Sequence, residues 1–246
     1  MIENQIVNKA IDYIFSHIEK ELSVDEISQY IGYSKYYLTR IFKAETGESI
    51  YAFIKRLKVE QSAWRLKVEK SRSITEIGNE FGYSSSNYAT LFREHFEKTP
   101  AQFRKDISTI TKNHVFFYGK QNLLETYEEC CKKITIEQLP DYFVFYERHK
   151  GNYSNLKQHW KMFMESNIEF VTDDTLFIER TINDPTITNP NECIYDICMT
   201  VSKDDSRLKF QKTAAAGITS KAGTPPQKNT MIIEGGKFAV YHYAGY

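Results

Sequence analysis

The sequence is poor in cysteine, and its few cysteines lack the spacing of a metal site. The four cysteines among the 246 residues, none of them in a Cys-x-x-Cys pair, are Cys130, Cys131, Cys193 and Cys198. No histidine lies at zinc-like spacing from any of them, which indicates reduced thiols and no metal. The chain also lacks a run of about 18 apolar residues, and its first residues lack the features of a signal peptide. We therefore expect a soluble, cytoplasmic protein with no membrane partner.

Neither charge sign is in excess, and no catalytic motif is present. The 32 Lys and Arg residues balance 32 Asp and Glu residues, and up to Lys112 the count is 17 basic against 15 acidic. Binding to DNA therefore has to be argued from where the basic residues lie. Gly-x-Ser-x-Gly, His-Glu-x-x-His and glycine-rich phosphate loops are missing, and His149, His159 and His242 are isolated. We expect neither an enzyme nor a bound cofactor.

The stretch from Gly32 to Gly47 is typical of the turn and second helix of a helix-turn-helix. Gly32 ends the preceding helix, Ser34 can cap the next one, and Gly47 ends it. An apolar stripe at helical spacing consists of Leu38, Ile41 and Phe42. The opposite face, which suits a DNA major groove, carries Lys35, Tyr36, Thr39, Arg40 and Lys43.

The same pattern occurs again fifty positions later. Ser23 and Glu26 have the spacing of a capping box, and so do Ser73 and Glu76. An amphipathic helix precedes the first copy, and a longer helix, 49–69, joins the two with one apolar face that includes Trp64. Roughly 20 residues at about 1.5 Å each span about 30 Å, near the 34 Å between successive major grooves. One chain could therefore place two reading helices on an asymmetric DNA site.

The two copies differ in the residues that they offer to DNA. Arg40 could pair with the O6 and N7 atoms of guanine, which would contribute roughly 1–3 kcal/mol of discrimination. The second copy has no such group at that position, and its short or polar residues suit phosphate contacts better. These residues are Ser85, Ser86, Asn87, Thr90 and Arg93. The alternative is that Arg40 and Arg93 are solvated helix charges.

After about residue 108 the pattern changes from helical to mixed. We expect a partly helical linker over 109–133, strands at 134–139 and 142–148, a helix with Leu156, Trp160 and Phe163, further strands at 176–181 and 193–201, a long loop at 202–230, and a last strand at 236–243. The fold class is therefore two domains, all-α at 1–108 and α+β with an antiparallel sheet at 134–246. Residues 144–151 are echoed at 238–245, so we expect either that the second domain is truncated or that half a module is absent.

Residues 6–104 resemble the DNA-binding domain of the AraC/XylS family of transcription regulators. The residues that carry this resemblance are Gly-Tyr-Ser-Lys-x-x-Leu-x-Arg-x-Phe-Lys-x-x-x-Gly at 32–47 and Phe-Arg-x-x-Phe-x-x-Thr-Pro-x-x-Phe-Arg at 92–104. The second half resembles the GyrI-like effector-binding domain of Rob-like regulators. Its matching segments are 183–188, 193–198 and 233–246, although Asn183 and Ile194 replace the usual residues.

The resemblance implies a transcription regulator with double-stranded DNA, RNA polymerase and a small-molecule effector as partners. GyrI-like domains hold a small, often cationic or amphipathic molecule, with an acidic residue that would lie beyond Tyr246 here. Candidate pocket residues, whose aromatic faces attract cations, are Tyr146, Trp160, Phe163, Tyr195, Tyr241 and Tyr243. Ordinary core packing is the alternative for each, and Asp196 and Glu147 either bind ligand or form local hydrogen bonds. Two other functions stay open: a GyrI-like small-molecule hydrolase and a protein that sequesters a partner.

Overall fold

The computed structural model describes residues 1–112, 116–118, 123–125, 127–205 and 229–242. The chain forms two compact units, each built from segments that are far apart in the sequence. One unit combines Met1–Glu60 with Tyr142–Ile233, and the other combines Gln61–Asp141 with Glu234–Tyr246. The first helix-turn-helix therefore belongs to the same unit as most of the α+β half. The domain boundaries inferred above remain a prediction about sequence modules.

The first helix-turn-helix consists of α1 (Gln5–Ser16), α2 (Val24–Ile31) and α3 (Lys35–Thr46). As predicted, Ser34 caps α3, and Gly32 and Gly47 end α2 and α3 at φ 81° and 80°. The capping box expected at Ser23 is only half formed. Ser23 Oγ accepts from the Glu26 amide at 3.1 Å, but the Glu26 carboxylate instead accepts from the Tyr13 hydroxyl at 2.7 Å.

The connecting helix α4 (Ile50–Val68) has about the predicted length, and its predicted apolar face is buried in the first turns but not in the last ones. Phe53 and Leu57 are fully buried, whereas Trp64 and Val68 are 39% and 47% exposed. The residues at 57–60 are all buried, so the helix packs on more than one side there. The prediction of one apolar stripe was therefore wrong for the last turns, where Ala63 and Leu66 are buried instead of Trp64 and Val68.

The second helix-turn-helix consists of α5 (Ile74–Glu80) and α6 (Ser85–Phe96), and α7 (Pro100–Lys112) follows. Here the capping box is complete, because Ser73 Oγ accepts from the Glu76 amide and the Glu76 carboxylate accepts from the Ser73 amide. The core is aromatic, with the Phe92 ring in edge contact with Tyr88 and with Phe103. Helix α6 ends at Glu97, which has the left-handed conformation (φ 57°) that glycine adopts at the ends of α2 and α3.

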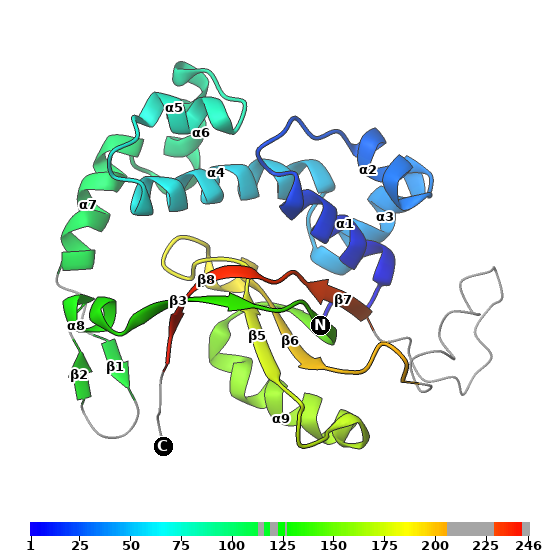
Figure 1. Ribbon diagram of the computed structural model, residues 1–246. Helices are drawn as coiled ribbons and strands as arrows, with labels where there is room; N and C mark the ends of the chain where they lie inside the picture. Colours follow the sequence, from blue (N-terminus) through cyan, green and yellow to red (C-terminus); the bar gives the residue numbers. More distant parts are fainter. Residues whose placement is uncertain (113–115, 119–122, 126, 206–228, 243–246) are drawn as a thin grey trace. The chain divides into compact units, whose positions relative to one another are not determined.

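The unit that holds α1–α3 also contains a four-stranded antiparallel sheet. Its strand order is β5-β6-β4-β7, from β4 (Tyr142–Lys150), β5 (Phe177–Thr181), β6 (Ile194–Thr200) and β7 (Asn229–Ile233). The helix α9 (Leu156–Asn167) packs on one face of this sheet (Figure 1). Three short 3-10 helices are η1 (Tyr153–Asn155), η2 (Ile168–Phe170) and η3 (Pro190–Glu192). Strand β7 was not predicted, and residues 206–228 of the expected loop lie outside the described residues.

The other unit contains a separate antiparallel pair, β3 (Ile134–Leu139) with β8 (Gly236–Tyr241). Gly235 precedes β8, where a side chain would collide with the Leu139 carbonyl, and its amide donates to Asp141 Oδ1 at 2.8 Å. The expected linker contains the short strands β1 (Phe116–Tyr118) and β2 (Leu123–Glu125) and the helix α8 (Tyr127–Lys132). The helical part of this linker was predicted, and the two strands were not.

No helix in the described ranges is both long enough and apolar enough to cross a lipid bilayer. Across the same ranges, no three His, Cys, Asp or Glu side chains gather as a metal-binding group.

Candidate DNA interface and effector face

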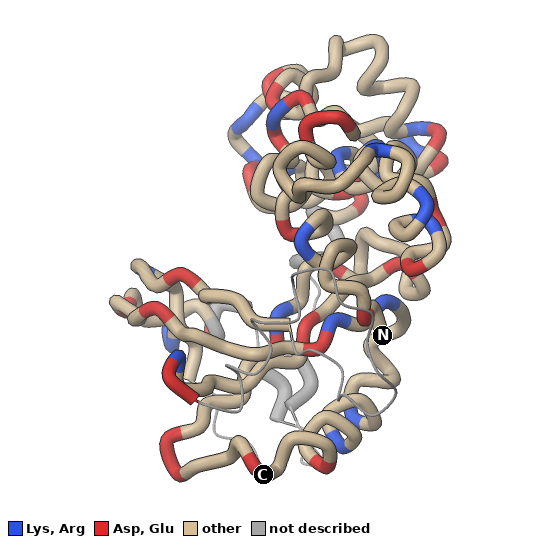
Figure 2. Tube along the Cα trace, turned by 90° about the vertical axis from the view of Figure 1, so that its right-hand side faces the viewer, with Lys and Arg blue, Asp and Glu red and all other residues tan. Residues whose placement is uncertain are grey.

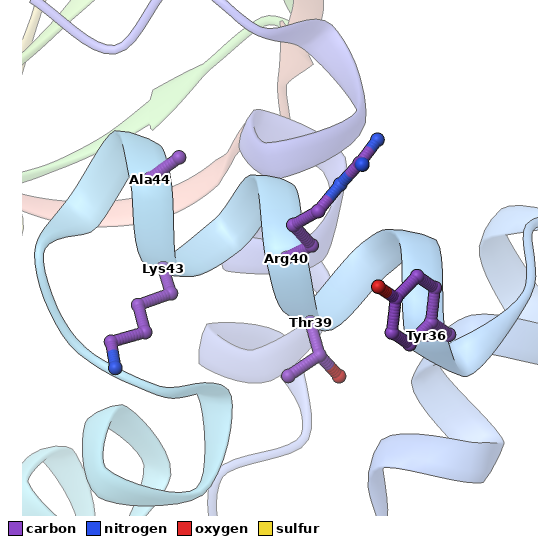
Figure 3. Close-up of a pocket in the computed structure, with 5 residues that line it drawn as sticks. All are labelled: Tyr36, Thr39, Arg40, Lys43 and Ala44. Atoms are coloured by element: carbon purple, nitrogen blue, oxygen red, sulfur yellow. The ribbon is translucent and has the colours of Figure 1, made fainter.

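The outward face of α3 carries an open depression of about 540 Å³ (Figure 3). Its lining residues are Tyr36, Thr39, Arg40, Lys43 and Ala44. Arg40 and Ala44 project from one flank of α3, while Thr39 and Lys43 project from the other (Figure 3). Tyr36 is 79% exposed, and Arg40 and Lys43 are exposed as well. Four of the five residues predicted to contact DNA in this copy thus share one accessible surface.

Local contacts orient the side chains on this surface. Thr39 Oγ1 donates to the Lys35 carbonyl at 2.7 Å, so its methyl group is the part left for an apolar contact with a base. The Arg40 guanidinium lies 5.8 Å from the centroid of the Tyr37 ring, which stacks on Tyr33. The fifth predicted residue, Lys35, lies outside the depression and pairs with Asp25 at 2.7 Å.

The outward face of α6 offers shorter groups. The five predicted residues, all exposed, are Ser85, Ser86, Asn87, Thr90 and Arg93. The Thr90 hydroxyl donates to the Ser86 carbonyl at 3.1 Å. Arg93 is the one cation in this predicted set of five residues. Hydroxyl, amide and single cationic groups at a helix surface are typical of contacts to phosphate oxygens. In Figure 2, Lys and Arg alternate with Asp and Glu along the tube rather than forming one long basic run.

The aromatic residues proposed for an effector pocket fall into three places. Phe163 and Tyr195 are buried in the core between α9 and the sheet, and Trp160 packs at its edge, with its ring perpendicular to that of Phe163. Tyr146 lies on the opposite face of β4, with Val144 and Cys198, because side chains alternate along a strand. Tyr241 belongs to β8 in the other unit, and Tyr243 lies outside the described residues. Three of the six therefore share one face.

Two histidines that looked isolated in the sequence stack on this same face. The rings of His149 in β4 and His159 in α9 are 4.1 Å apart, and His159 Nδ1 lies 2.7 Å from the Tyr195 hydroxyl. Burial, together with the neighbouring His149, lowers the pKa of His159 and favours its neutral form. Sequence reasoning missed this cluster because nothing in the local pattern shows which residues of a strand and a helix will face each other.

The two acidic residues considered for ligand binding, Asp196 and Glu147, lie in different environments. Asp196 is fully buried and accepts from Arg148 Nε at 2.7 Å, and Arg180 lies 3.1 Å from its other oxygen. Its charge is thus used inside the protein. Glu147 is partly exposed, with a carboxylate oxygen 3.8 Å from His149 Nε2. Of the two, Glu147 is the one that a ligand could reach.

Two successive helix-turn-helix units, one with an open basic and polar face, define a DNA-binding protein, and the α+β half adds a second module. The comparisons with known proteins agree with this class. Residues 19–106 match the family model described as a helix-turn-helix domain, and residues 132–246 match that of a GyrI-like small molecule binding domain.

Relatives match the first module. The chain is 31% identical over 105 residues to the regulatory protein SoxS of Salmonella typhimurium, covering 42% of this chain and 97% of SoxS. It is 32% identical over 119 residues to the probable transcription factor PqrA of Proteus vulgaris, covering 47% of this chain and 95% of PqrA. A crystal structure of an AraC-type regulator from Chromobacterium violaceum matches at 29% identity and a TM-score of 0.40, covering 42% of this chain and 92% of that one. The chain belongs to the AraC family of helix-turn-helix transcription regulators, and it carries a GyrI-like domain.

Proposed function

We propose that this regulator recognises an asymmetric DNA site through two unequal helix-turn-helix units. The observation that carries the proposal is the contrast between their outward faces: α3 offers Arg40 with Tyr36, Thr39 and Lys43, whereas α6 offers short polar groups with Arg93. The 19-residue helix α4 between the units supports it, because about 1.5 Å per residue gives roughly 28 Å. That length is close to the spacing of about 34 Å between successive major grooves. The first helix-turn-helix reads bases, and the second contacts the phosphate backbone of the DNA.

The division of roles is tested with two arginine variants on an enriched site and its single-base changes. Arg40→Ala should cost roughly 1–3 kcal/mol on the best site and much less on sites altered at one base position. Arg93→Ala should weaken binding to all sites by a similar factor and reduce the salt slope by about 1. Fluorescence anisotropy across a salt series measures both. Equal losses of Arg40→Ala on every site would contradict its role in base reading.

We propose further that a small molecule binds at the α9 face of the sheet and modulates DNA binding, with RNA polymerase as the partner that reads out the result. The half-buried Trp160 and Tyr153 around the buried Phe163 and Tyr195 provide an aromatic surface, and Glu147 lies on the same side of β4 as His149. Planar cations suit such a surface. No catalytic role is part of this proposal.

The effector proposal is tested by titrating planar aromatic cations and their neutral analogues into a Trp64→Phe variant. Its remaining tryptophan, Trp160, then reports the α9 face alone. A compound that quenches Trp160 should change the affinity for DNA, and DNA should change the affinity for that compound by the same factor. Compounds that bind at Trp160 but leave the DNA affinity unchanged would contradict modulation through this face.

A further inference from the structure

The end of strand β4 holds the first helix-turn-helix to the sheet, within one compact unit. The first contact between the two is made by Ile2, whose amide donates to the Arg148 carbonyl of β4 at 2.8 Å in a short antiparallel bridge. The Asn8 side-chain amide donates to the Ile2 carbonyl at 3.0 Å, so α1 is tied to the same bridge. Ile2 and Asn8 are both buried.

The Arg148 side chain joins β4, β6 and α1 through a single guanidinium. It donates from Nε and Nη2 to the two Asp196 oxygens at 2.7 and 2.9 Å, and from Nη2 to Asp12 Oδ1 in α1 at 2.7 Å. Its Nη1 donates to the Asn8 carbonyl at 3.1 Å. Burial by itself would lower the pKa of Arg148, but the charges of Asp196 and Asp12 outweigh burial and raise it. A fully buried arginine of this kind is a fixed charge that tolerates little change in its partners.

Lys150 lies two residues further on, on the same face of β4, and it holds the reading helix. Its Nζ donates to the carbonyl of Thr46, the last residue of α3, at 2.6 Å. The carboxylates of Glu48 and Glu192 lie 3.4 and 2.5 Å from the same nitrogen. Helix C-terminal carbonyls lack intrahelical partners, and a cation there is favourable. The end of α3 is therefore fixed to the strand.

A third connection reaches α4 from the loop before β6. The Glu60 carboxylate, 2% exposed, accepts from Arg56 of the same helix at 3.1 Å and from the Thr188 hydroxyl at 3.0 Å. Asn183 donates to the same carboxylate at 3.4 Å, and its own Oδ1 accepts from the Ile194 amide at the start of β6. Asn183 and Thr188 belong to the segment 183–188 that carried the family resemblance in the sequence.

Between the two clamping residues, His149 points to the other face of β4, where it stacks on His159 of α9. Three successive residues of one strand thus contact α1, α9 and α3. We propose that Arg148 and Lys150 with their partners Asp12 and Thr46, the β4 clamp, transmit the state of the α9 face to the reading helix. The clamp leaves the depression on α3 open, so it orients α3 for DNA rather than covering it. This inference rests on the proposed DNA-reading role of α3 and specifies how that role is regulated.

The decisive variant is Asp12→Asn, because two explanations predict opposite signs for it. Removal of a negative charge should strengthen DNA binding if only long-range electrostatics matters. Loss of the clamp should instead weaken it by at least about fivefold, the lower end of the usual range for coupling between sites. Asn is isosteric with Asp and leaves the buried pair of Arg148 with Asp196 in place, so we expect the fold to be kept while the charge that attracts Arg148 to α1 is lost. Affinity equal to that of the wild type, or tighter, would overturn the proposal.

Lys150→Met provides the second arm, and α9 supplies matched controls for both. Lys161 and Glu165 form an exposed pair on α9 at 3.8 Å, so Lys161→Met and Glu165→Gln repeat the two charge changes away from the clamp. We expect Lys150→Met to weaken DNA binding at least about fivefold more than Lys161→Met. We expect Glu165→Gln not to weaken it at all. Clamp variants that match their controls would contradict the inference.

Hydrogen exchange separates failure of the clamp from failure of the DNA-reading proposal. In both clamp variants, amides of α1 and of the last turn of α3 should exchange faster than in the wild type, with or without DNA. In the wild type, DNA should slow exchange in β4 and α9, and the clamp variants should lose that effect by reciprocity. If the wild type binds no enriched DNA sequence, the proposed function fails; unchanged exchange at α1 and α3 in the variants rejects the clamp itself.

Discussion

Gly78 in α5 is small because its partner in α6 is large. A methyl group added there would lie 2.8 Å from Cδ1 and 2.9 Å from Cγ of Tyr88, closer than side-chain carbons approach in practice. Tyr88 cannot move aside easily, since it is 1% exposed and its hydroxyl donates to Ser62 Oγ at 3.0 Å. Burial also raises the pKa of Tyr88 to about 12. We therefore predict that Gly78→Ala destabilises the second helix-turn-helix.

The expected size is a difference of two opposing effects. Alanine in place of glycine inside a helix gains about 1 kcal/mol from propensity. Overpacking of a buried contact costs about 1–3 kcal/mol. The net loss is therefore up to about 2 kcal/mol, or up to roughly thirtyfold in the population of the locally open state.

Native-state hydrogen exchange of the amides in α5 and α6 measures this loss directly. The first copy suggests the control, because fifty positions earlier the corresponding pair is Ser28 with Leu38. In a Tyr88→Leu background the clash is gone, so Gly78→Ala should become neutral or stabilising. Slower exchange after Gly78→Ala in the otherwise wild-type protein would refute the reasoning.

The remaining predictions concern the second cap and the thiols. Ser73→Ala should cost about 0.5–2 kcal/mol of α5 stability, because it removes the N-cap. In the wild type, α5 should lose stability as the pH falls below 4.5, because hydrogen bonds from Ser73 lower the folded-state pKa of Glu76. Hydrogen exchange of the α5 amides that changes neither with Ser73→Ala nor with pH would contradict the cap. Cys131 is exposed, so iodoacetamide should label it in the native protein, whereas buried Cys193 and Cys198 should react only after unfolding. Burial raises the pKa of the Cys193 thiol to about 11, and burial also raises the pKa of the Cys198 thiol, so native labelling of either at pH 8 would contradict their burial.

The helical half was predictable because its signals are local. Caps, glycine stops and apolar spacing each act within one or two turns, so α3, with Ser34 before it and Gly47 after it, appears where expected. The repeat at an offset of fifty then fixed the second copy. The face of α4 was not predictable at Trp64, because burial there depends on which neighbours pack around the helix rather than on its own period.

The α+β half shows where local signals end. A strand was predicted at 142–148, and β4 continues to Lys150, but strand alternation separates Tyr146 from the aromatic residues that pack under α9. The pairing of Arg148 with Asp12 joins residues 136 positions apart, and no periodicity links them. Contacts of this kind follow from the tertiary fold alone. The DNA-facing residues could be proposed from sequence, whereas the connection that orients them could not.

The most direct test of the central claim is selection of the full chain on a randomised double-stranded DNA pool, followed by anisotropy titration of the enriched sequence across a salt series. The account predicts one asymmetric motif, bound by a single chain, with one sharply specified block read by α3, a weakly specified block about one helical turn away, and a steep salt slope. A palindromic motif bound by two chains, or no enrichment at all, would contradict recognition by two unequal units of one molecule.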